Sequence, residues 1–332
     1  MTARRIASCV CLAGLAPMAV PARAAAAEEV VLENAHVRVV IDATLGRVTA
    51  FTPTATGRDL LWRPTPGQLA LEASGAGYWN HGGDKVWPAP QPVWRYALGR
   101  IWPPDVATDG RGARLERIGP RGVRLVFPTS DAFGTTLQRT FALDADAAVL
   151  RVHNRIRQEW RSPFPAQVWS ITQVPLPERV LFDVATDAPV AVAQPVNMNA
   201  VRAQPPLEPE PFLPGSVAQG EGWLAFRPGE RGQKLGSLGR WLAGVWPDGV
   251  LVLTVPYDPA GMYPEATSLQ VYHDDNYAEL ETLGPARHLV PGDVLENEVV
   301  WRWFPELASG RDDEALVRDI SAALPSVRSP QS

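Results

Sequence analysis

The chain has 332 residues, and its 31 basic and 36 acidic side chains give a formal net charge of −5 at pH 7. This acidic balance, without a basic cluster, argues against a nucleic-acid partner and against an anionic membrane surface. Beyond the N-terminal segment, no stretch approaches the ~18 consecutive apolar residues of a membrane span. The 33 prolines favour strands and loops over helices, and the excess of 12 tryptophans needs an explanation. All basic residues are arginine except Lys85 and Lys234, a bias that fits a GC-rich genome.

The N-terminus has the pattern of a secretory signal peptide. A twin arginine at positions 4 and 5 precedes an apolar region over residues 6–20 and an alanine-rich cleavage region over residues 22–27. Both cysteines, Cys9 and Cys11, fall inside this segment, so the mature chain is predicted to have neither disulfides nor thiol chemistry. We therefore expect an exported protein, periplasmic or secreted, that is held together by a large core.

Short runs of alternating apolar residues predict β-strands along most of the remaining chain. Residues 64–104 are instead rich in loop-forming and aromatic residues, and the prolines within residues 204–214 predict an extended loop. The predicted strands, several of them in hairpins, lie within residues 30–34, 36–42, 47–52, 114–127, 135–143, 148–156, 168–174, 223–226, 241–246, 250–255, 269–273, 277–283 and 294–304.

The last predicted element is a helix over Asp312–Leu324. Leu316 and Ile320 belong to its apolar stripe, and acidic residues in its first turn suit the positive end of a helix dipole. Without an internal repeat or a clear linker, the predicted fold is mainly β, one large antiparallel β-sandwich with a short C-terminal helix. The predicted organisation is a signal peptide (1–27), a β-sandwich domain (28–308), and a C-terminal helix and tail (309–332).

A hairpin around the turn at residues 274–276 carries the first candidate site. In its second strand, period-2 alternation places Tyr277, Glu279 and Glu281 on one face and the intervening residues on the core face. Two carboxylates at i and i+2 have Cα atoms roughly 6.5 Å apart, so each hinders the ionisation of the other. One of them could therefore transfer protons near neutral pH. The alternative interpretation is a solvated strand face with two surface glutamates.

A segment near residue 80 combines tryptophans, charged groups and a tight turn. Trp79 and Trp87 are flat apolar surfaces with one N–H donor each, and Asp84 and Lys85 place polar groups beside them. Apolar faces for C–H groups, together with charged or amide groups for hydroxyls, are typical of a sugar site. The alternative is that the tryptophans fill the core and that His81 is an ordinary loop histidine.

Residues 81–87, HGGDKVW, resemble the His-Gly-Gly…Asp-Lys-x-x-Trp segment of aldose 1-epimerases (galactose mutarotases), although this sequence is a few residues shorter there. Leu280-Glu281-Thr282 resembles the Leu-Glu-Thr of the same family. The overall pattern is similar to an exported bacterial family of unknown function within this superfamily, through WSITQ at residues 169–173 and ELETLGP at residues 279–285. The resemblance covers most of residues 30–304.

The resemblance implies a β-supersandwich with a sugar-sized cleft on one sheet and a carbohydrate partner. It implies that Glu281 takes the proton of the anomeric hydroxyl and that His81 binds a hydroxyl. The family's general acid is a histidine on a strand that corresponds to residues 167–173, which contain none. Either another group protonates the ring oxygen, with His273 as the best-placed substitute, or the site only binds sugar. The expected substrate-binding residues are Trp79, Asp84, Lys85, Trp87, Trp169, Tyr277 and Glu279.

Other interpretations stay open. A glycoside-active enzyme would need Glu279 and Glu281 to flank one bond with carboxyl groups ~5–5.5 or ~6.5–9.5 Å apart, which neighbours on one strand do not easily do. A protein-interaction or structural sandwich would hold its tryptophans in the core and both glutamates in open solvent. A metal site formed by these glutamates with His273, Asp274 and Asp275 is the weakest interpretation, because the spacing matches no ligand loop. No metal and no cofactor is predicted.

Overall fold

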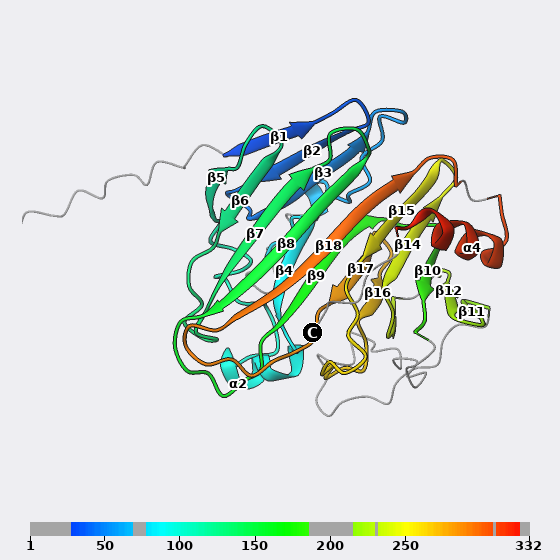
Figure 1. Ribbon diagram of the computed structural model, residues 1–332. Helices are drawn as coiled ribbons and strands as arrows, with labels where there is room; N and C mark the ends of the chain where they lie inside the picture. Colours follow the sequence, from blue (N-terminus) through cyan, green and yellow to red (C-terminus); the bar gives the residue numbers. More distant parts are fainter. Residues whose placement is uncertain (1–27, 69–77, 186–214, 230–231, 308–309, 326–332) are drawn as a thin grey trace, which may run out of the picture.

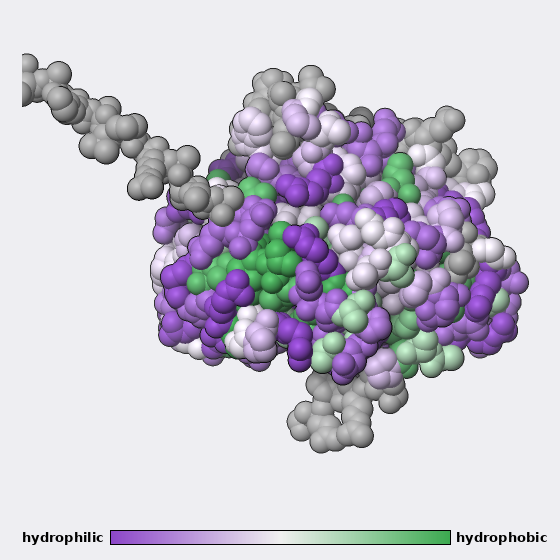
Figure 2. Space-filling model, turned by 90° about the horizontal axis from the view of Figure 1, so that it is seen from above, coloured by the Kyte–Doolittle hydropathy of each residue, from purple (hydrophilic) through white to green (hydrophobic). Residues whose placement is uncertain are grey.

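The computed structural model describes residues 28–68, 78–185, 215–229, 232–307 and 310–325. The predicted signal peptide (1–27) and the predicted proline-rich loop (204–214) lie outside these ranges. No helix within them is long and apolar enough to cross a membrane. The face seen in Figure 2 is mostly hydrophilic, with hydrophobic groups gathered near the middle of the view.

Two large antiparallel sheets make up the described fold, and Figure 1 shows them as overlapping layers. In sheet A each strand pairs antiparallel with its neighbour. Its order is β1 (Glu29–Glu33), β2 (Val37–Asp42), β3 (Arg47–Pro53), β4 (Asp84–Ala89), β9 (Gln167–Pro175), β17 (Tyr277–Leu283), β16 (Leu269–His273) and β13 (Gln233–Ser237).

Sheet B is the larger layer, and the long strands β18 and β8 run through its middle (Figure 1). Its order is β11 (Val217–Gly220), β12 (Trp223–Phe226), β10 (Arg179–Asp183), β14 (Trp241–Trp246), β15 (Gly249–Thr254), β18 (Val294–Phe304), β8 (Val149–Gln158), β7 (Thr135–Leu143), β6 (Gly122–Val126) and β5 (Arg114–Arg117).

The main hydrophobic core lies between the two sheets and takes side chains from both. Ala278 and Leu280 of β17 and Val168 and Val174 of β9 point into it. Because side chains alternate along a strand, the intervening residues of β17 and β9 lie on the other face of sheet A. The predicted antiparallel β-sandwich is confirmed, and so is the predicted core face of the 277–283 strand.

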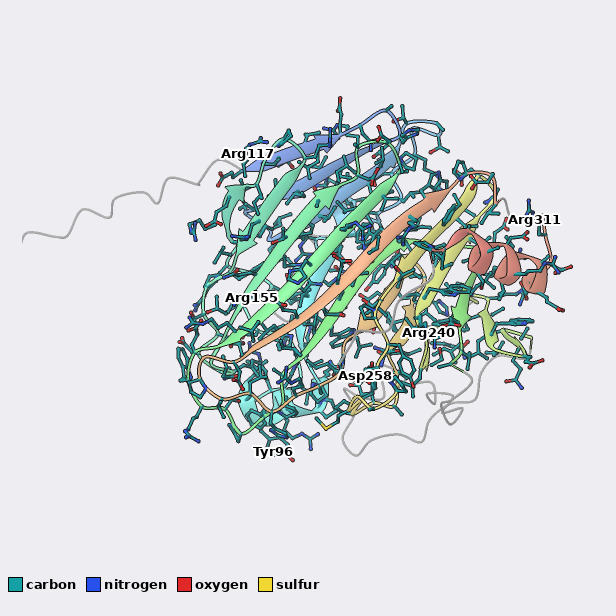
Figure 3. The ribbon with its side chains drawn as sticks, in the orientation of Figure 1. Tyr96, Arg117, Arg155, Arg240, Asp258 and Arg311 are labelled. Carbon is teal, nitrogen blue, oxygen red and sulfur yellow. The ribbon has the colours of Figure 1, made fainter. Side chains whose placement is uncertain are left out.

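Helix α4 (Asp313–Ala323) covers the face of sheet B that points away from the main core. Its fully buried Leu316 and Ile320 pack with sheet residues, and Figure 1 shows the helix beside β14 and β10. The Asp312 carboxylate accepts a hydrogen bond from the Ala315 N–H at 2.7 Å and caps the helix. Arg311, labelled in Figure 3, precedes this cap at the surface. The predicted C-terminal helix is confirmed.

Strand β4 lies inside the aromatic stretch that the sequence predicted to be loop. Pro88 falls within it, and a proline normally argues against an interior strand. β4 pairs with β9 over its whole length but with β3 only at Val48 and Asp84. Most of one edge therefore needs no ladder hydrogen bonds, and the proline is tolerated. Strands β10, β11 and β13 are further additions to the predicted set.

A short helical segment follows β4 and borders the outer face of sheet A. It consists of η1 (Gln91–Val93) and α2 (Trp94–Ala97). Trp94 is fully buried and packs against Trp87, with ring centroids 5.8 Å apart, while Tyr96 is exposed at the end of the molecule (Figure 3). Part of the tryptophan excess thus packs on the outer face of sheet A, outside the main core.

Candidate functional site

A pocket lies on the face of sheet A that points away from the main core. Five adjacent strands, β4, β9, β17, β16 and β13, supply most of its side chains, and the loops before and after β4 supply the others. Its cavity volume is about 80 Å³. The lining residues are Tyr78, Asn80, Lys85, Trp87, Trp102, Trp169, Gln173, Lys234, Tyr272, Tyr277 and Glu279.

The register of the strands brings these side chains together. Gln173 on β9 pairs with Glu279 on β17, which pairs with Tyr272 on β16. Tyr272 pairs in turn with Lys234 on β13. Directly opposed residues point to the same face of a sheet, so these four side chains form one row across four strands. This row forms the floor of the pocket.

Glu281 and Lys234 form an ion pair that we call the closed pair. Lys234 Nζ lies 2.8 Å from Oε2 and 3.1 Å from Oε1 of Glu281, and the Trp169 indole N–H donates to Oε2 at 2.8 Å. The same Nζ lies 4.8 Å from the centroid of the Trp169 ring. Glu281 is 0% exposed and does not belong to the pocket lining. The carboxylate that the resemblance proposes as base is therefore bonded through both oxygens beneath the pocket surface.

Glu279 and Lys85 form a looser pair, the open pair, that faces the pocket. Lys85 Nζ lies 3.8 Å from Glu279 Oε1, and Gln173 Nε2 donates to that same oxygen at 2.8 Å. Within the described chain, Lys85 Nζ and Gln173 Oε1 are buried atoms without a hydrogen-bond partner. A polar donor and a polar acceptor, each of which normally has a partner when buried, therefore lie in one pocket.

Burial moves the titration of the open pair towards neutral pH. Desolvation lowers the pKa of Lys85 to about 8, although the Glu279 carboxylate acts in the opposite direction. Desolvation also raises the pKa of Glu279 to about 7, opposed by the Lys85 ammonium and reinforced by the Glu281 carboxylate. Either group can therefore gain or lose a proton near neutral pH.

Asp109 holds the aromatic wall of the pocket in place. Its Oδ2 accepts hydrogen bonds from the Tyr78 hydroxyl at 2.9 Å and from the Trp87 indole N–H at 2.7 Å. Its Oδ1 forms a buried ion pair with Arg47. The Trp87 ring meets Trp169 edge-to-face, with ring centroids 5.4 Å apart. The orientation of the wall is thus determined by a charged pair behind it.

Five of the residues predicted for the site line the same pocket. Lys85, Trp87, Trp169, Tyr277 and Glu279 line the pocket together, drawn from β4, β9 and β17. The alternative of two solvated surface glutamates is wrong, because Glu279 is only 7% exposed and its neighbour on the same face is fully buried. For the same reason the structural-sandwich interpretation, which requires both glutamates in open solvent, is not supported.

Other predicted residues lie elsewhere. Asp84 is on the opposite face of β4, where it forms a buried ion pair with Arg139 and accepts a hydrogen bond from Thr172 at 2.9 Å. Trp79 is 45% exposed and outside the pocket lining. His81 is half-buried in the loop before β4, also outside the lining, and burial lowers its pKa.

His273 lies on the core side of β16, next in sequence to the pocket-lining Tyr272. It is fully buried, its ring centroid is 5.4 Å from that of Phe226, and desolvation lowers its pKa. It therefore faces away from the pocket and from Glu279, and the hairpin does not assemble the metal-ligand set considered above. Across the described ranges, no three His, Cys, Asp or Glu side chains lie close enough to hold a metal ion.

Several residues that sequence reasoning missed lie in or beside the stretches it singled out: Gln173 ends the WSITQ run, and Tyr272 is on the first strand of the hairpin. Another missed residue had a signal in the sequence: Lys234 is the only lysine besides Lys85. The missed residues of the site are Tyr78, Asn80, Trp102, Asp109, Gln173, Lys234 and Tyr272.

Solved structures with a similar fold include a candidate aldose 1-epimerase from Escherichia coli K12, with a TM-score of 0.56, 12% identity, and coverage of 84% of this chain and 99% of that one. A galactose mutarotase-like protein from Lactobacillus casei has a TM-score of 0.56 and 10% identity, over 83% of this chain and 100% of that one. A TPR-domain containing protein from Parabacteroides distasonis has a TM-score of 0.57 and 14% identity, over 91% of this chain and 50% of that one.

These likenesses show that the fold is galactose mutarotase-like. No curated protein sequence matches the chain. Residues 55–304 match the sequence profile of a family described as a domain of unknown function, DUF4380, and the chain therefore belongs to that family.

Proposed function

We propose that the pocket on sheet A binds carbohydrate. One observation carries the proposal: an aromatic wall stands beside a buried donor, Lys85 Nζ, and a buried acceptor, Gln173 Oε1, in one cavity. Sugars present apolar C–H faces that suit aromatic rings and hydroxyl groups that suit buried polar atoms. The likeness of the fold to a galactose mutarotase-like protein supports the same class of ligand.

Binding is tested by thermal-shift and calorimetric titration of the purified protein with D-galactose, D-glucose, D-glucuronate and lactose. A ligand at about a hundredfold excess over its Kd adds about 2.7 kcal/mol to the free energy of unfolding and raises Tm. We expect Trp102→Ala, in the pocket wall, to abolish this rise. Trp79→Ala, which removes an exposed tryptophan outside the lining, is the matched control and should keep it. No shift with any sugar, or equal behaviour of the two variants, contradicts the proposal.

The open pair favours a second function, proton transfer to the bound sugar as in an aldose 1-epimerase. The supporting observation is that a buried carboxyl group, Glu279, lines the pocket beside a buried amine. Glycoside hydrolysis has less support, because Glu279 and Glu281 lie on one strand and only Glu279 lines the pocket, so they do not flank a bond.

We also propose that the protein is exported, on the basis of the signal-peptide pattern over residues 1–27. The expected result is a mature N-terminus near residue 28 in protein recovered from a periplasmic or culture fraction. N-terminal sequencing measures this directly, and a chain that keeps Met1 in the cytoplasmic fraction contradicts it.

A further inference from the structure

The two lysines of the sequence lie in the same pocket. Every other basic residue is an arginine, whose guanidinium stays protonated in proteins, whereas a buried lysine can lose its proton. Both lysines also face a buried glutamate. The chain therefore has two lysines, and both line the pocket on sheet A.

A structural role, the ion pair with Glu281, explains why Lys234 is a lysine. Lys234 Nζ contacts both oxygens of Glu281, and this closed pair leaves neither charge unpartnered. Lys85 has no such bond: its side chain is 2% exposed, and its Nζ lies 3.8 Å from the nearest carboxylate oxygen. Burying an ammonium without a hydrogen bond is unfavourable, and such groups occur preferentially at functional sites.

We propose that Lys85 and Glu279 are the proton-transfer pair of the pocket, in which Lys85 protonates the ring oxygen of a bound aldose and Glu279 accepts the proton of its anomeric hydroxyl. This inference rests on the proposed sugar binding. It supplies the acid that strand β9 lacks. It also assigns the base to Glu279, because Glu279 lines the pocket and Glu281 does not.

The bond changes balance without a further reactant. Glu279 takes the proton of O1, the electron pair of that O–H bond forms the C1=O bond, and the C1–O5 bond breaks. Its electron pair goes to O5, which takes a proton from Lys85. After rotation about C1–C2, O5 adds to the other face of C1, Lys85 recovers the proton of O5, and Glu279 returns its proton to O1. The sugar emerges as the other anomer, and both side chains regain their starting protonation.

The groups around Lys85 and Glu279 favour the protonation states that this cycle requires. Near neutral pH the Glu279 carboxylate and the Lys85 ammonium favour each other's charged form, against the desolvation that raises the pKa of Glu279 and lowers that of Lys85. Tyr78 and Tyr277 stay neutral there, because burial raises the pKa of each well above its ordinary value. The other charged groups near the pair occur as oppositely charged partners, which are Glu281 with Lys234, Arg47 with Asp109, and Asp84 with Arg139.

A first test observes the lysines directly. Protein labelled with ¹³C at lysine Cε gives one NMR signal for each of the two lysines, and Lys85→Arg assigns them. We expect Lys85 to titrate well below the ordinary lysine pKa of about 10.4. Glu279→Gln should move its midpoint further down, because the carboxylate favours the ammonium. A Lys85 midpoint at the ordinary value, or one that Glu279→Gln leaves unmoved, overturns the pair whether or not a sugar binds.

A second test measures the mutarotation rate of freshly dissolved α-D-galactose and α-D-glucose by polarimetry. Lys85→Met, which keeps the side-chain length without the charge, should lower kcat/KM by about 10²-fold or more, the contribution typical of a general acid. The Kd measured by calorimetry should change far less. Lys85→Arg should not restore the rate, because arginine does not release its proton. The wild-type kcat/KM should be bell-shaped in pH, with an acid limb from Glu279 and an alkaline limb from Lys85.

The outcomes separate the two proposals. If a sugar binds but the protein does not accelerate its mutarotation, or if Lys85→Met keeps the wild-type rate, the proton-transfer assignment is overturned while carbohydrate binding stands. If none of the sugars binds, the proposed function fails, and the assignment of the pair to an aldose fails with it.

Discussion

The closed pair and the open pair use the same two residue types on the same face of sheet A, yet they are bonded differently. In the closed pair, Glu281 accepts from Lys234 through both oxygens and from Trp169. In the open pair, Glu279 accepts from a neutral amide, Gln173, while its lysine stands 3.8 Å away. Both glutamates are buried, so burial does not distinguish them. The two pairs therefore differ in their bonding and not in their composition or burial.

The strand register places the two lysines symmetrically about the two glutamates. Lys234 occupies the same row as Glu279, two strands away, but its side chain reaches diagonally to Glu281 in the adjacent row. Lys85 pairs with Ile171 in the row of Glu281, and its nearest carboxylate oxygen belongs to Glu279. The side chain of each lysine thus extends towards the glutamate of the adjacent row. Only Lys234 lies within hydrogen-bond distance of its glutamate.

The largest expected effect comes from breaking the closed pair. Glu281→Leu leaves Lys234 buried without its partner, and losing one member of a buried pair costs about 3–5 kcal/mol of the free energy of unfolding. Urea denaturation measures the loss. Glu279→Leu is the matched control on the same strand, and we expect it to cost less because Lys85 has no hydrogen bond to Glu279 to lose. Equal losses in the two variants would remove the distinction between the pairs.

The pH dependence of stability sharpens the comparison. Between pH 4.5 and about 7 the folded protein holds a proton on Glu279 that the unfolded chain has released, so Glu279 contributes a fall in stability as pH rises. His81 and His273, whose pKa burial lowers, contribute a rise below pH 6.5 that is common to wild type and Glu279 variants. Between about 8 and 10.5 the unfolded chain holds a Lys85 proton that the folded protein has released, so stability rises with pH. Each slope is at most about 1.4 kcal/mol per pH unit.

This pH profile is measured by urea denaturation at a series of pH values. In Glu279→Gln the stability should rise more steeply, or fall less, with pH between pH 4.5 and about 7 than in wild type, because the titrating carboxyl group is gone. A variant with the wild-type pH profile in this window shows that Glu279 does not contribute to it, and the open pair then does not titrate as described.

The smallest expected effect comes from a substitution outside the pocket, which serves as a control for general destabilisation. Asp312→Ala removes the N-cap of α4, on the far side of sheet B, and should lower the free energy of unfolding by about 1 kcal/mol. Sugar-induced shifts in Tm should keep their size in this variant. A loss of sugar response in Asp312→Ala would mean that general destabilisation, rather than pocket chemistry, explains the effects of the pocket variants.

The alternation of the sequence predicted a good part of this architecture. The hairpin on both sides of residues 274–276 was placed correctly, and with it the shared face of Glu279 and Glu281, since local period-2 pattern and turn residues determine both. Strand β4 was missed because Pro88 and the preceding glycines are local signals for a loop. Its extended conformation comes from pairing with β9, a partner far along the chain.

By itself, then, the sequence determined the mainly β class, the C-terminal helix and the face of each recognised strand, because these depend on short-range periodicity. Only the tertiary structure decided which polar groups meet. Lys234 is 47 residues from Glu281, and the two come together through the register of β13 on β16 and of β16 on β17. A slip of one residue would turn such side chains to the other face of the sheet. Which lysine lies beside which glutamate is therefore a property of long-range strand pairing, which no local pattern encodes.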